Sequence, residues 1–387
     1  MTDAGARAAG PLRLPARLEA SIKAAADEMD ATRDVPATLL AELRDAGAFR
    51  LLTPRELGGF EVPLRTVLEV YERFGRLDAS VAWIVWNANW GFLGALLEEP
   101  GVARLWNAGS EPVFANSGMP GTAVTVSGGY RVSGGWRLVS GINGADWLVV
   151  AAVITDDGAP RITEAGTPDV RLFVLHRDQL SVKDTWHVSG LRGSGSNDVL
   201  VDDALVPDEL VARIDVPARI RRPLYQGFIP ALVFPGCTAI VLGVAQAAID
   251  ETVELARSKK TLTGGVLADG AHAQAVIART EASLRAARLL LLSAAEAMDE
   301  VGANGEAVTL EQRAALRAAM SHGAQVSREA LAAMYELGSS SSLYHGSPVE
   351  RLFQDGMVAL QHANHSAAFF EAAGRVRLGR GPGMALF

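Results

Sequence analysis

Residues 184–207 read DTWHVSGLRGSGSNDVLVDDALVP, and this segment decides the fold class. Three glycines stand within six residues, at Gly190, Gly193 and Gly195, and an alternating apolar run follows until Pro207. The alternation predicts a β-strand with period two. The glycine- and serine-rich turn before it is compatible with two structures, a loop that cradles a phosphate or a plain hairpin. The sequence on either side is needed to choose between them.

A central β-domain is predicted around this segment, over residues 111–216. Residues 123–141 (AVTVSGGYRVSGGWRLVSG) predict strand, turn, strand, turn and strand, because Ser-Gly-Gly occurs twice between alternating runs. Residues 146–154 (DWLVVAAVI) and 170–176 (VRLFVLH) are continuous runs rich in strand-forming residues. Together these segments predict an all-β unit of roughly a hundred residues.

Helical periodicity is found on both sides of the β-domain. In the N-terminal domain, residues 1–110, helices are predicted within 36–49, where Gly47 is the expected stop, at 64–77 and at 80–97, the last as one buried helix because it is apolar nearly all round. In the C-terminal domain, residues 217–387, the alanine-rich amphipathic runs 278–298 and 309–337 predict a helical bundle. The fold class is therefore mainly α with a central β-domain.

Charge and cysteine content narrow the classes of partner. The net charge of −8 does not favour nucleic acid or an anionic membrane surface as a partner. Cys237 is the only cysteine, which fits a cytoplasmic location, and residues 1–15 lack the continuous apolar core of a signal peptide. The longest apolar stretch is interrupted by Pro235 and Gly236, so no membrane span is expected.

Three sequence motifs, in the same order along the chain, resemble motifs of the acyl-CoA dehydrogenase superfamily. Residues 47–64 (GAFRLLTPRELGGFEVPL) are similar to that family's N-terminal helix end and Pro-Glu-x-x-Gly-Gly loop, and residues 190–207 to its strand leading out of the β-domain. Residues 351–362 (RLFQDGMVALQH) are similar to its late Arg-x-x-Arg-Asp helix, with Gln354 in place of the second arginine. The resemblance implies an N-terminal helical domain, a β-barrel or sandwich, and a C-terminal four-helix bundle.

Two departures separate this chain from the dehydrogenases themselves. The Thr-Glu-Pro word of the dehydrogenases is replaced by FANSGMPGTAV at 114–124. Their glutamate base is missing, because LQHANH at 360–365 contains no carboxylate and Glu371 lies more than two helical turns further on. A thioester cannot lose its α-proton without a base, so acyl-CoA oxidation is not expected.

Residues 128–147 (GGYRVSGGWRLVSGINGADW) and 184–199 instead resemble a sub-group of the same fold, the two-component flavin monooxygenases. This sub-group includes dibenzothiophene monooxygenase and the oxygenase component of 4-hydroxyphenylacetate hydroxylase. The resemblance implies an enzyme that uses reduced flavin (FADH2 or FMNH2) and O2, through a C4a-(hydro)peroxyflavin, to hydroxylate an apolar aromatic or polycyclic metabolite. It also implies a homotetramer.

A separate flavin reductase is expected as the partner, because the chain has no Gly-x-Gly-x-x-Gly word at a strand–helix junction to bind a nicotinamide. Three alternatives stay open at this point: an N-oxygenase of the same fold, an acyl-CoA dehydrogenase with an unusual base, and a non-catalytic scaffold.

The resemblance assigns two catalytic residues. Ser140 falls where the superfamily places a hydroxyl beside flavin N5, and His362 falls where the monooxygenases place a histidine facing the flavin. His365 is the alternative to His362, since the two would share one face of a helix. No further ligand stands at suitable spacing, so no metal is expected.

The remaining site residues are predicted as two groups, for which packing in the core or in a hairpin is the competing interpretation. The predicted cofactor-binding residues are Asn116, Ser117, Trp136, Arg192, Ser194 and Ser196. The predicted substrate-binding residues are Asn87, Trp90, Tyr225, Phe228 and Phe234.

Overall fold

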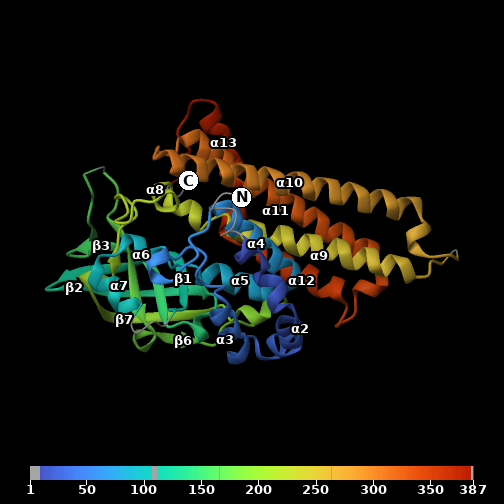
Figure 1. The fold of residues 1–387 in the computed structure, drawn as a ribbon, viewed down its shortest axis with the longest axis horizontal. Coiled ribbons are helices and arrows are strands. Elements are labelled where there is room, and N and C mark those ends of the chain that lie inside the picture. Colours follow the sequence, from blue (N-terminus) through green and yellow to red (C-terminus); the bar gives the residue numbers. More distant parts are fainter. Residues whose placement is uncertain (1–8, 107–110, 165, 263, 385–386) are drawn as a thin grey trace.

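The computed structural model describes residues 9–106, 111–164, 166–262, 264–384 and 387. Helices come first along the chain, strands follow, and long helices end it, with the sheet and the bundle at opposite ends of the molecule (Figure 1). The helices before the sheet are α2 (Leu14–Thr32), α3 (Ala37–Ala46), α4 (Leu64–Leu77), α5 (Ala79–Ala88), α6 (Leu93–Leu96) and α7 (Glu99–Leu105). The predicted fold class is confirmed.

The short helices follow the expected rules at their ends. Helix α3 stops at Gly47, whose φ of 86° lies in the left-handed region that glycine adopts without strain. Helix α4 has the predicted bounds and buries Val67, Val70, Tyr71 and Phe74 along one face.

The single helix predicted over 80–97 is wrong, because Asn89 breaks it. The Asn89 side chain accepts a hydrogen bond from Leu51 N at 2.8 Å and donates to Ala48 O at 2.8 Å and Val85 O at 2.7 Å. The buried Asn89 amide therefore bonds backbone groups both at the end of α5 and in the segment after α3, and so links the two.

Eight strands form one sheet in the order β6-β7-β2-β1-β3-β5-β8, with β4 paired to β3. Neighbours are antiparallel except β1 and β3, which are parallel. The strands are β1 (Phe114–Val126), β2 (Gly129–Val139), β3 (Trp147–Asp156), β4 (Ala159–Pro160), β5 (Val170–His176), β6 (Ser181–Lys183), β7 (Asn197–Pro207) and β8 (Val211–Ala212).

The turn predicted at residues 133–135 does not exist, because β2 continues through it. The register with β7 shifts between Val132 and Gly134. A Cβ atom on Gly134 would lie 2.8 Å from the Trp136 indole, and one on Gly121 of the next strand would lie 2.5 Å from it. The glycines therefore make room for the Trp136 ring inside the sheet domain instead of forming a turn.

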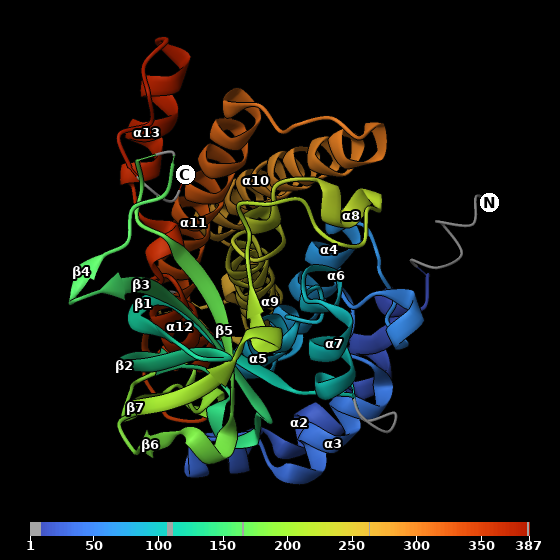
Figure 2. The ribbon, with the colours of Figure 1, turned by 90° about the vertical axis from the view of Figure 1, so that its left-hand side faces the viewer.

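The C-terminal helices form the bundle, which lies behind the sheet when the molecule is viewed from the sheet side (Figure 2). Helix α9 lies at its centre and packs on α4, α11 and α12. The bundle helices are α8 (Pro223–Gln226), α9 (Gly236–Ser258), α10 (Ala271–Asn304), α11 (Leu310–Gly338), α12 (Pro348–Ala359) and α13 (Ala368–Arg377).

Helix α9 is longer than the broken apolar stretch suggested. Residues 229–258 are long and apolar enough to cross a membrane by length and composition, with a mean hydropathy of 2.0 in the most apolar window. Within that window 83% is buried inside the structure. This burial accounts for the apolar composition as that of a central core helix.

Candidate active site

The opening segment forms a loop that docks onto the helices. Its glycines lie against neighbours: a Cβ on Gly190 would meet the Gln354 backbone at 2.3 Å, and one on Gly193 would meet the Met29 side chain at 2.8 Å. Leu191 and Gly195 both have a φ of 51°, on either side of the short 3-10 helix η6 (Arg192–Ser194). The segment is therefore neither a free phosphate loop nor a plain hairpin.

A chain of buried hydroxyl groups connects this loop to the end of β2. Ser140 follows the last residue of the strand, and its Oγ lies 2.8 Å from Ser196 Oγ, which lies 2.8 Å from Ser194 Oγ. All three serines are buried. Gly141 N donates to Ser194 O at 2.9 Å, so backbone and side chains hold the loop against the strand end together.

Trp83 of α5 extends this chain to the helices. Its Nε1–H donates to Ser140 Oγ over 3.1 Å. Its ring meets Trp86 edge-on, with the centroids 4.9 Å apart, and Trp86 Nε1 donates to Val233 O at 2.8 Å. Tryptophan suits this position because a large apolar ring carries one polar N–H that needs a partner when buried.

His362 lies against the two tryptophans, at centroid distances of 5.7 Å from Trp83 and 5.3 Å from Trp86. Helix α12 has already ended at Ala359, so the shared helical face expected for His362 and His365 is wrong. His362 instead caps the 3-10 helix η11 (Ala363–His365), and its Nδ1 accepts a hydrogen bond from Asn364 N at 3.2 Å. The neutral imidazole must then carry its proton on Nε2.

Burial keeps His362 neutral near pH 7. Burial, and then the charge of Arg317, lower the pKa of His362 to about 4. Nε2–H has no hydrogen-bond partner among the residues that the structure describes. His362 can therefore donate a neutral hydrogen bond, whereas its low pKa makes it a weak base.

His365 lies further in, and burial together with the neighbouring His362 lowers its pKa to about 3. Its ring centroid is 6.2 Å from that of His362, while the two tryptophan rings contact His362. This arrangement favours His362 over His365 as the residue that faces a ligand.

Arg317 of α11 supports the turn that carries His362, and sequence analysis missed it. Its guanidinium lies 4.1 Å from the Phe234 ring centroid and 4.2 Å from that of Phe369, and Nη1 donates to Asn364 Oδ1 at 3.2 Å. Burial lowers the pKa of Arg317 to about 10, so it remains a cation at neutral pH. The predicted substrate residue Phe234 is thereby connected to the same site.

Two predicted residues from different groups bind one another. Asn116, on β1, donates from Nδ2 to both the carbonyl and the side-chain oxygen of Asn87, each at 3.0 Å. Asn87 in turn donates to Trp83 O at 2.8 Å. Ser117 is the next residue of β1, just before the register shift that separates it from Gly121. The start of β1 is thus fixed to the end of α5.

The structure does not bring Arg192 or Trp136 into this site. Arg192 donates to Asp30 O at 2.9 Å and to Val188 O at 3.1 Å, so its guanidinium is used to dock the loop on α2. Trp136 is buried in the sheet core, with its N–H donated to Met119 O at 2.8 Å. These contacts give both side chains a packing role, and their cofactor-binding role stays a prediction.

The other predicted substrate residues also have structural partners. Tyr225 donates its hydroxyl to Leu52 O at 2.9 Å, and Phe228 lies under Arg313 at 4.1 Å. Trp90 packs on Phe92, with ring centroids 5.1 Å apart. None of these contacts joins the three residues to His362 or Ser140, and their substrate role stays a prediction.

The residues that do meet are suited to a flavin ring. Trp83, Trp86 and Phe234 supply apolar surface, and Ser140, Asn116 and His362 supply neutral polar groups where the N-terminal helices, the sheet and the C-terminal helices meet. Of the carboxylates near the expected base position, Asp355 accepts a hydrogen bond from Leu191 N at 2.6 Å and Glu371 is exposed on α13. A planar, largely apolar ring with a polar edge fits this set of donors.

Comparison with known proteins agrees with this arrangement. The acyl-CoA dehydrogenase N-terminal domain matches residues 16–101, and the acyl-CoA dehydrogenase C-terminal domain matches residues 236–367. The indole-3-acetate monooxygenase of Pseudomonas putida is 30% identical over 364 residues, which cover 92% of this chain and 90% of that protein. The flavin-dependent monooxygenase oxygenase subunit HsaA of Rhodococcus jostii is 27% identical, covering 89% and 91%.

Solved structures share the fold over nearly the whole chain. XiaF from Streptomyces sp., solved with FADH2 and glycerol, superposes with a TM-score of 0.89 at 23% identity and covers 99% of this chain and 98% of its own. HsaA from M. tuberculosis superposes with a TM-score of 0.89 at 24% identity, covering 98% and 100%. The chain belongs to the acyl-CoA dehydrogenase superfamily and, within it, to the flavin-dependent monooxygenases.

Proposed function

We propose that this chain is the oxygenase component of a two-component system that hydroxylates a small apolar aromatic compound, with flavin reduced by a separate reductase. The observation that carries the proposal is the meeting of His362, two tryptophans and the Ser140 hydroxyl chain at the junction of three domains. Reduced flavin, when bound, supplies the oxygen-activating chemistry.

Ser140 would donate a hydrogen bond to the flavin edge. It already accepts one from Trp83 Nε1. If Ser194 donates to Ser196 and Ser196 donates to Ser140, the Ser140 oxygen accepts twice, and its own proton is left to point at a ligand. Ser194 and Ser196 therefore serve the cofactor by orienting Ser140, since both are buried behind it.

His362 would donate from Nε2–H to the oxygen that is transferred or to the substrate. The hydrogen bond from Asn364 N fixes the tautomer, and the edge contacts with Trp83 and Trp86 fix the ring. The same aromatic side chains exclude water, which limits the loss of activated oxygen as hydrogen peroxide.

An indole- or phenol-like substrate is favoured by these walls, because aromatic rings pack edge-to-face against tryptophan. Two similar proteins are named for such compounds, an indole-3-acetate monooxygenase and a resorcinol hydroxylase. We also propose a cytoplasmic homotetramer. The exposed Leu289 and Leu290 of α10 support contact between copies, since 52% and 48% of their surfaces are uncovered.

The test supplies the protein with chemically reduced FAD or FMN and oxygen, together with indole-3-acetate, indole or resorcinol. Oxygenated product and hydrogen peroxide are counted per reduced flavin. Substrate-dependent product is expected from at least one compound. Butyryl-CoA to palmitoyl-CoA with a dye acceptor should give no turnover. Dye reduction by an acyl-CoA, or no product from any aromatic compound, would argue against the proposal.

A further inference from the structure

Two buried carboxylates and one arginine form a charge cluster next to the site. Arg351 of α12 lies 3.0 Å from Asp78 and 3.8 Å from Asp355, measured between Nη2 and Oδ2 and between Nε and Oδ2. Asp78 and Asp355 are each 7% exposed. Burying carboxylates is costly unless charge and hydrogen bonds offset it, so such a cluster needs a reason.

Each member of the cluster holds an element that carries part of the site. Asp355 Oδ1 accepts from Leu191 N at 2.6 Å, which fixes the loop that contains Ser194 and Ser196. Asp78 Oδ1 accepts from Val81 N at 2.9 Å and caps the start of α5, the helix of Trp83. Asp355 itself lies on α12, the helix that leads directly to His362.

The loop at Gly190 and helix α12 at Gln354 lie in direct main-chain contact. A Cβ on Gly190 would lie 2.3 Å from the Gln354 backbone, so the two main chains touch. Leu191 then turns its N–H into the buried space beside Asp355, from a left-handed conformation with φ of 51°. The carboxylate is the partner that makes this strained approach favourable.

We propose that Asp355, acting through Leu191 N and through Arg351 on Asp78, is a positioning residue that sets the hydroxyl chain of Ser140, the indole of Trp83 and the imidazole of His362 relative to one another. The proposal rests on the function proposed above, because it assigns those three groups to the oxygenation site. The hydrogen bond of Asp355 goes to Leu191 N and its ion pair to Arg351, so it acts on the elements that carry the three groups.

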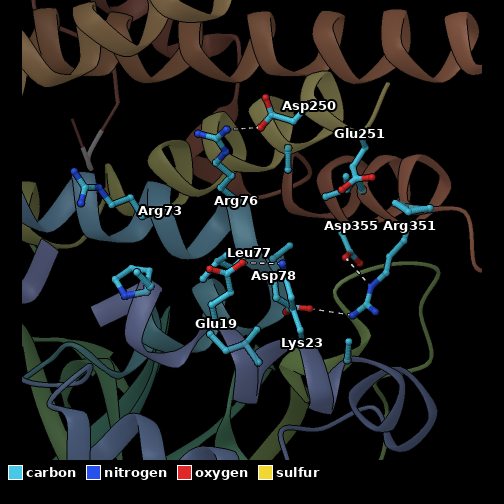
Figure 3. Close-up of a pocket in the computed structure, with 18 of the residues that line it drawn as sticks. Glu19, Lys23, Arg73, Arg76, Leu77, Asp78, Asp250, Glu251, Arg351 and Asp355 are labelled. Carbon is cyan, nitrogen blue, oxygen red and sulfur yellow. Dashed lines mark hydrogen bonds and ion pairs between the residues drawn. The ribbon is translucent and has the colours of Figure 1, made fainter. Parts of the chain in front are cut away.

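A cavity lies beside this cluster, and a second ion pair on the cavity wall serves as the control for the experiment. The cavity, of about 560 Å³, lies between α2, α4, α9 and α12, and Asp78, Arg351 and Asp355 line it (Figure 3). Arg76 and Asp250 form a second ion pair on its wall, 2.6 Å long, with both side chains about half exposed. Asp250 lies on α9, and the pair joins α9 to α4, neither of which carries Ser140, Trp83 or His362.

The experiment compares Asp355→Asn with Asp250→Asn at pH 8, above the pKa of about 7 to which burial raises Asp355. Amide hydrogen exchange is followed in residues 188–197, with α10 as internal reference. Product and hydrogen peroxide are counted per reduced flavin. Asp355→Asn should speed loop exchange roughly tenfold and move most of the oxygen into peroxide, because Leu191 N would then donate to a neutral amide oxygen, which is a weaker acceptor than a carboxylate. Asp250→Asn should change neither.

Arg351→Gln is the second variant in case Asp355→Asn does not fold, since it cuts only the link from Asp355 to Asp78. It should raise peroxide release at unchanged exchange in α10. Faster loop exchange without a change in coupling would reduce Asp355 to a structural anchor and overturn the proposal, as would equal effects in Asp250→Asn. A wild type that forms no oxygenated product would refute the proposed function instead, because the exchange measurement does not need turnover.

Discussion

At the scale of single residues, the proposed role of His362 predicts how efficiently oxygen is transferred to substrate. His362→Ala should lower product per reduced flavin by roughly 10–100-fold while oxygen consumption continues, because one donor to a charged oxygen is removed. The missing product should be recovered as hydrogen peroxide. His365→Ala is the control, since its ring lies behind that of His362. Greater uncoupling in the His365 variant would reverse the assignment of the two histidines.

Besides its proposed cofactor role, Ser140 is expected to contribute to folding stability. Ser140→Ala leaves Trp83 Nε1 without its buried partner and leaves Ser196 Oγ with Ser194 alone, so the free energy of unfolding should fall by about 1–3 kcal/mol. Adding Trp83→Phe removes the stranded N–H, and the double variant should lose less than the sum of the two single changes. Urea unfolding of the four proteins measures this coupling. Strict additivity would mean that the hydrogen bond contributes nothing.

The neutral state of His362 has a consequence for stability against pH. The unfolded chain takes up the imidazole proton below about pH 6.5, whereas the folded chain resists it down to about pH 4. His362 therefore destabilises the fold as the pH falls through this window, by up to about 2 kcal/mol at pH 5. Between pH 7.5 and 5, wild type should lose more free energy of unfolding than His362→Gln. The exposed His345→Gln should follow wild type, and parallel curves for all three would contradict the burial of His362.

Sequence motifs identified Ser140 and His362. In the structure both lie where the N-terminal helices, the sheet and the C-terminal helices meet. The same motifs could not reveal Trp83 or Arg317, whose positions depend on contacts between distant parts of the chain. Trp83 looked like one more apolar residue of a buried helix, and its N–H direction becomes visible only once β2 is in place. Arg192 shows the reverse case. A cation in a glycine-rich loop suggests a phosphate-binding site, whereas in the structure the Arg192 guanidinium donates to a backbone carbonyl of α2.

At the scale of elements, the break between α5 and α6 rests on one amide. Asn89→Ala would leave Leu51 N and Ala48 O unpaired in the interior, so a loss of about 2 kcal/mol or more is expected in the free energy of unfolding. Asn143→Ala removes an exposed hydrogen bond to Asp34 and should cost less than about 0.5 kcal/mol. Chemical denaturation compares them, and similar losses would show that the Asn89 contacts are not needed.

The spacing of apolar residues predicted helices and strands well where no contact from a distant part of the chain intervenes. Helix α4 and strands β5 and β7 have the bounds that the patterns gave. The pattern failed where a side chain from elsewhere intervenes, as with Asn89, or where glycines serve a neighbouring ring, as with Gly134 and Trp136. Such effects are tertiary, and a local window of sequence does not contain them.

At the scale of the whole molecule, the order of helices, sheet and bundle could be predicted because the period of the apolar residues changes from helical to two and back to helical along the chain. Assembly of copies is a separate matter, for which α10 offers the test because it lies along the outer edge of the bundle (Figure 1). If the proposed tetramer forms through this face, Leu289→Glu with Leu290→Glu should lower the molar mass measured by light scattering below that of the wild type. Leu200→Glu, equally exposed on β7, should leave it unchanged. An unchanged mass in the α10 variant would place the interface elsewhere.

The deep burial of α9 has a consequence for synthesis of the chain on the ribosome. Of its neighbours, α4 is made before it, whereas α11 and α12 are made after it. About a hundred residues must be added after Ser258 before Ala359 completes the cover, which takes roughly 5–20 s at typical elongation rates. Throughout that interval this long apolar helix stays partly uncovered. The nascent chain then exposes the apolar surface of α9, which makes it prone to aggregation and a target for a holding chaperone.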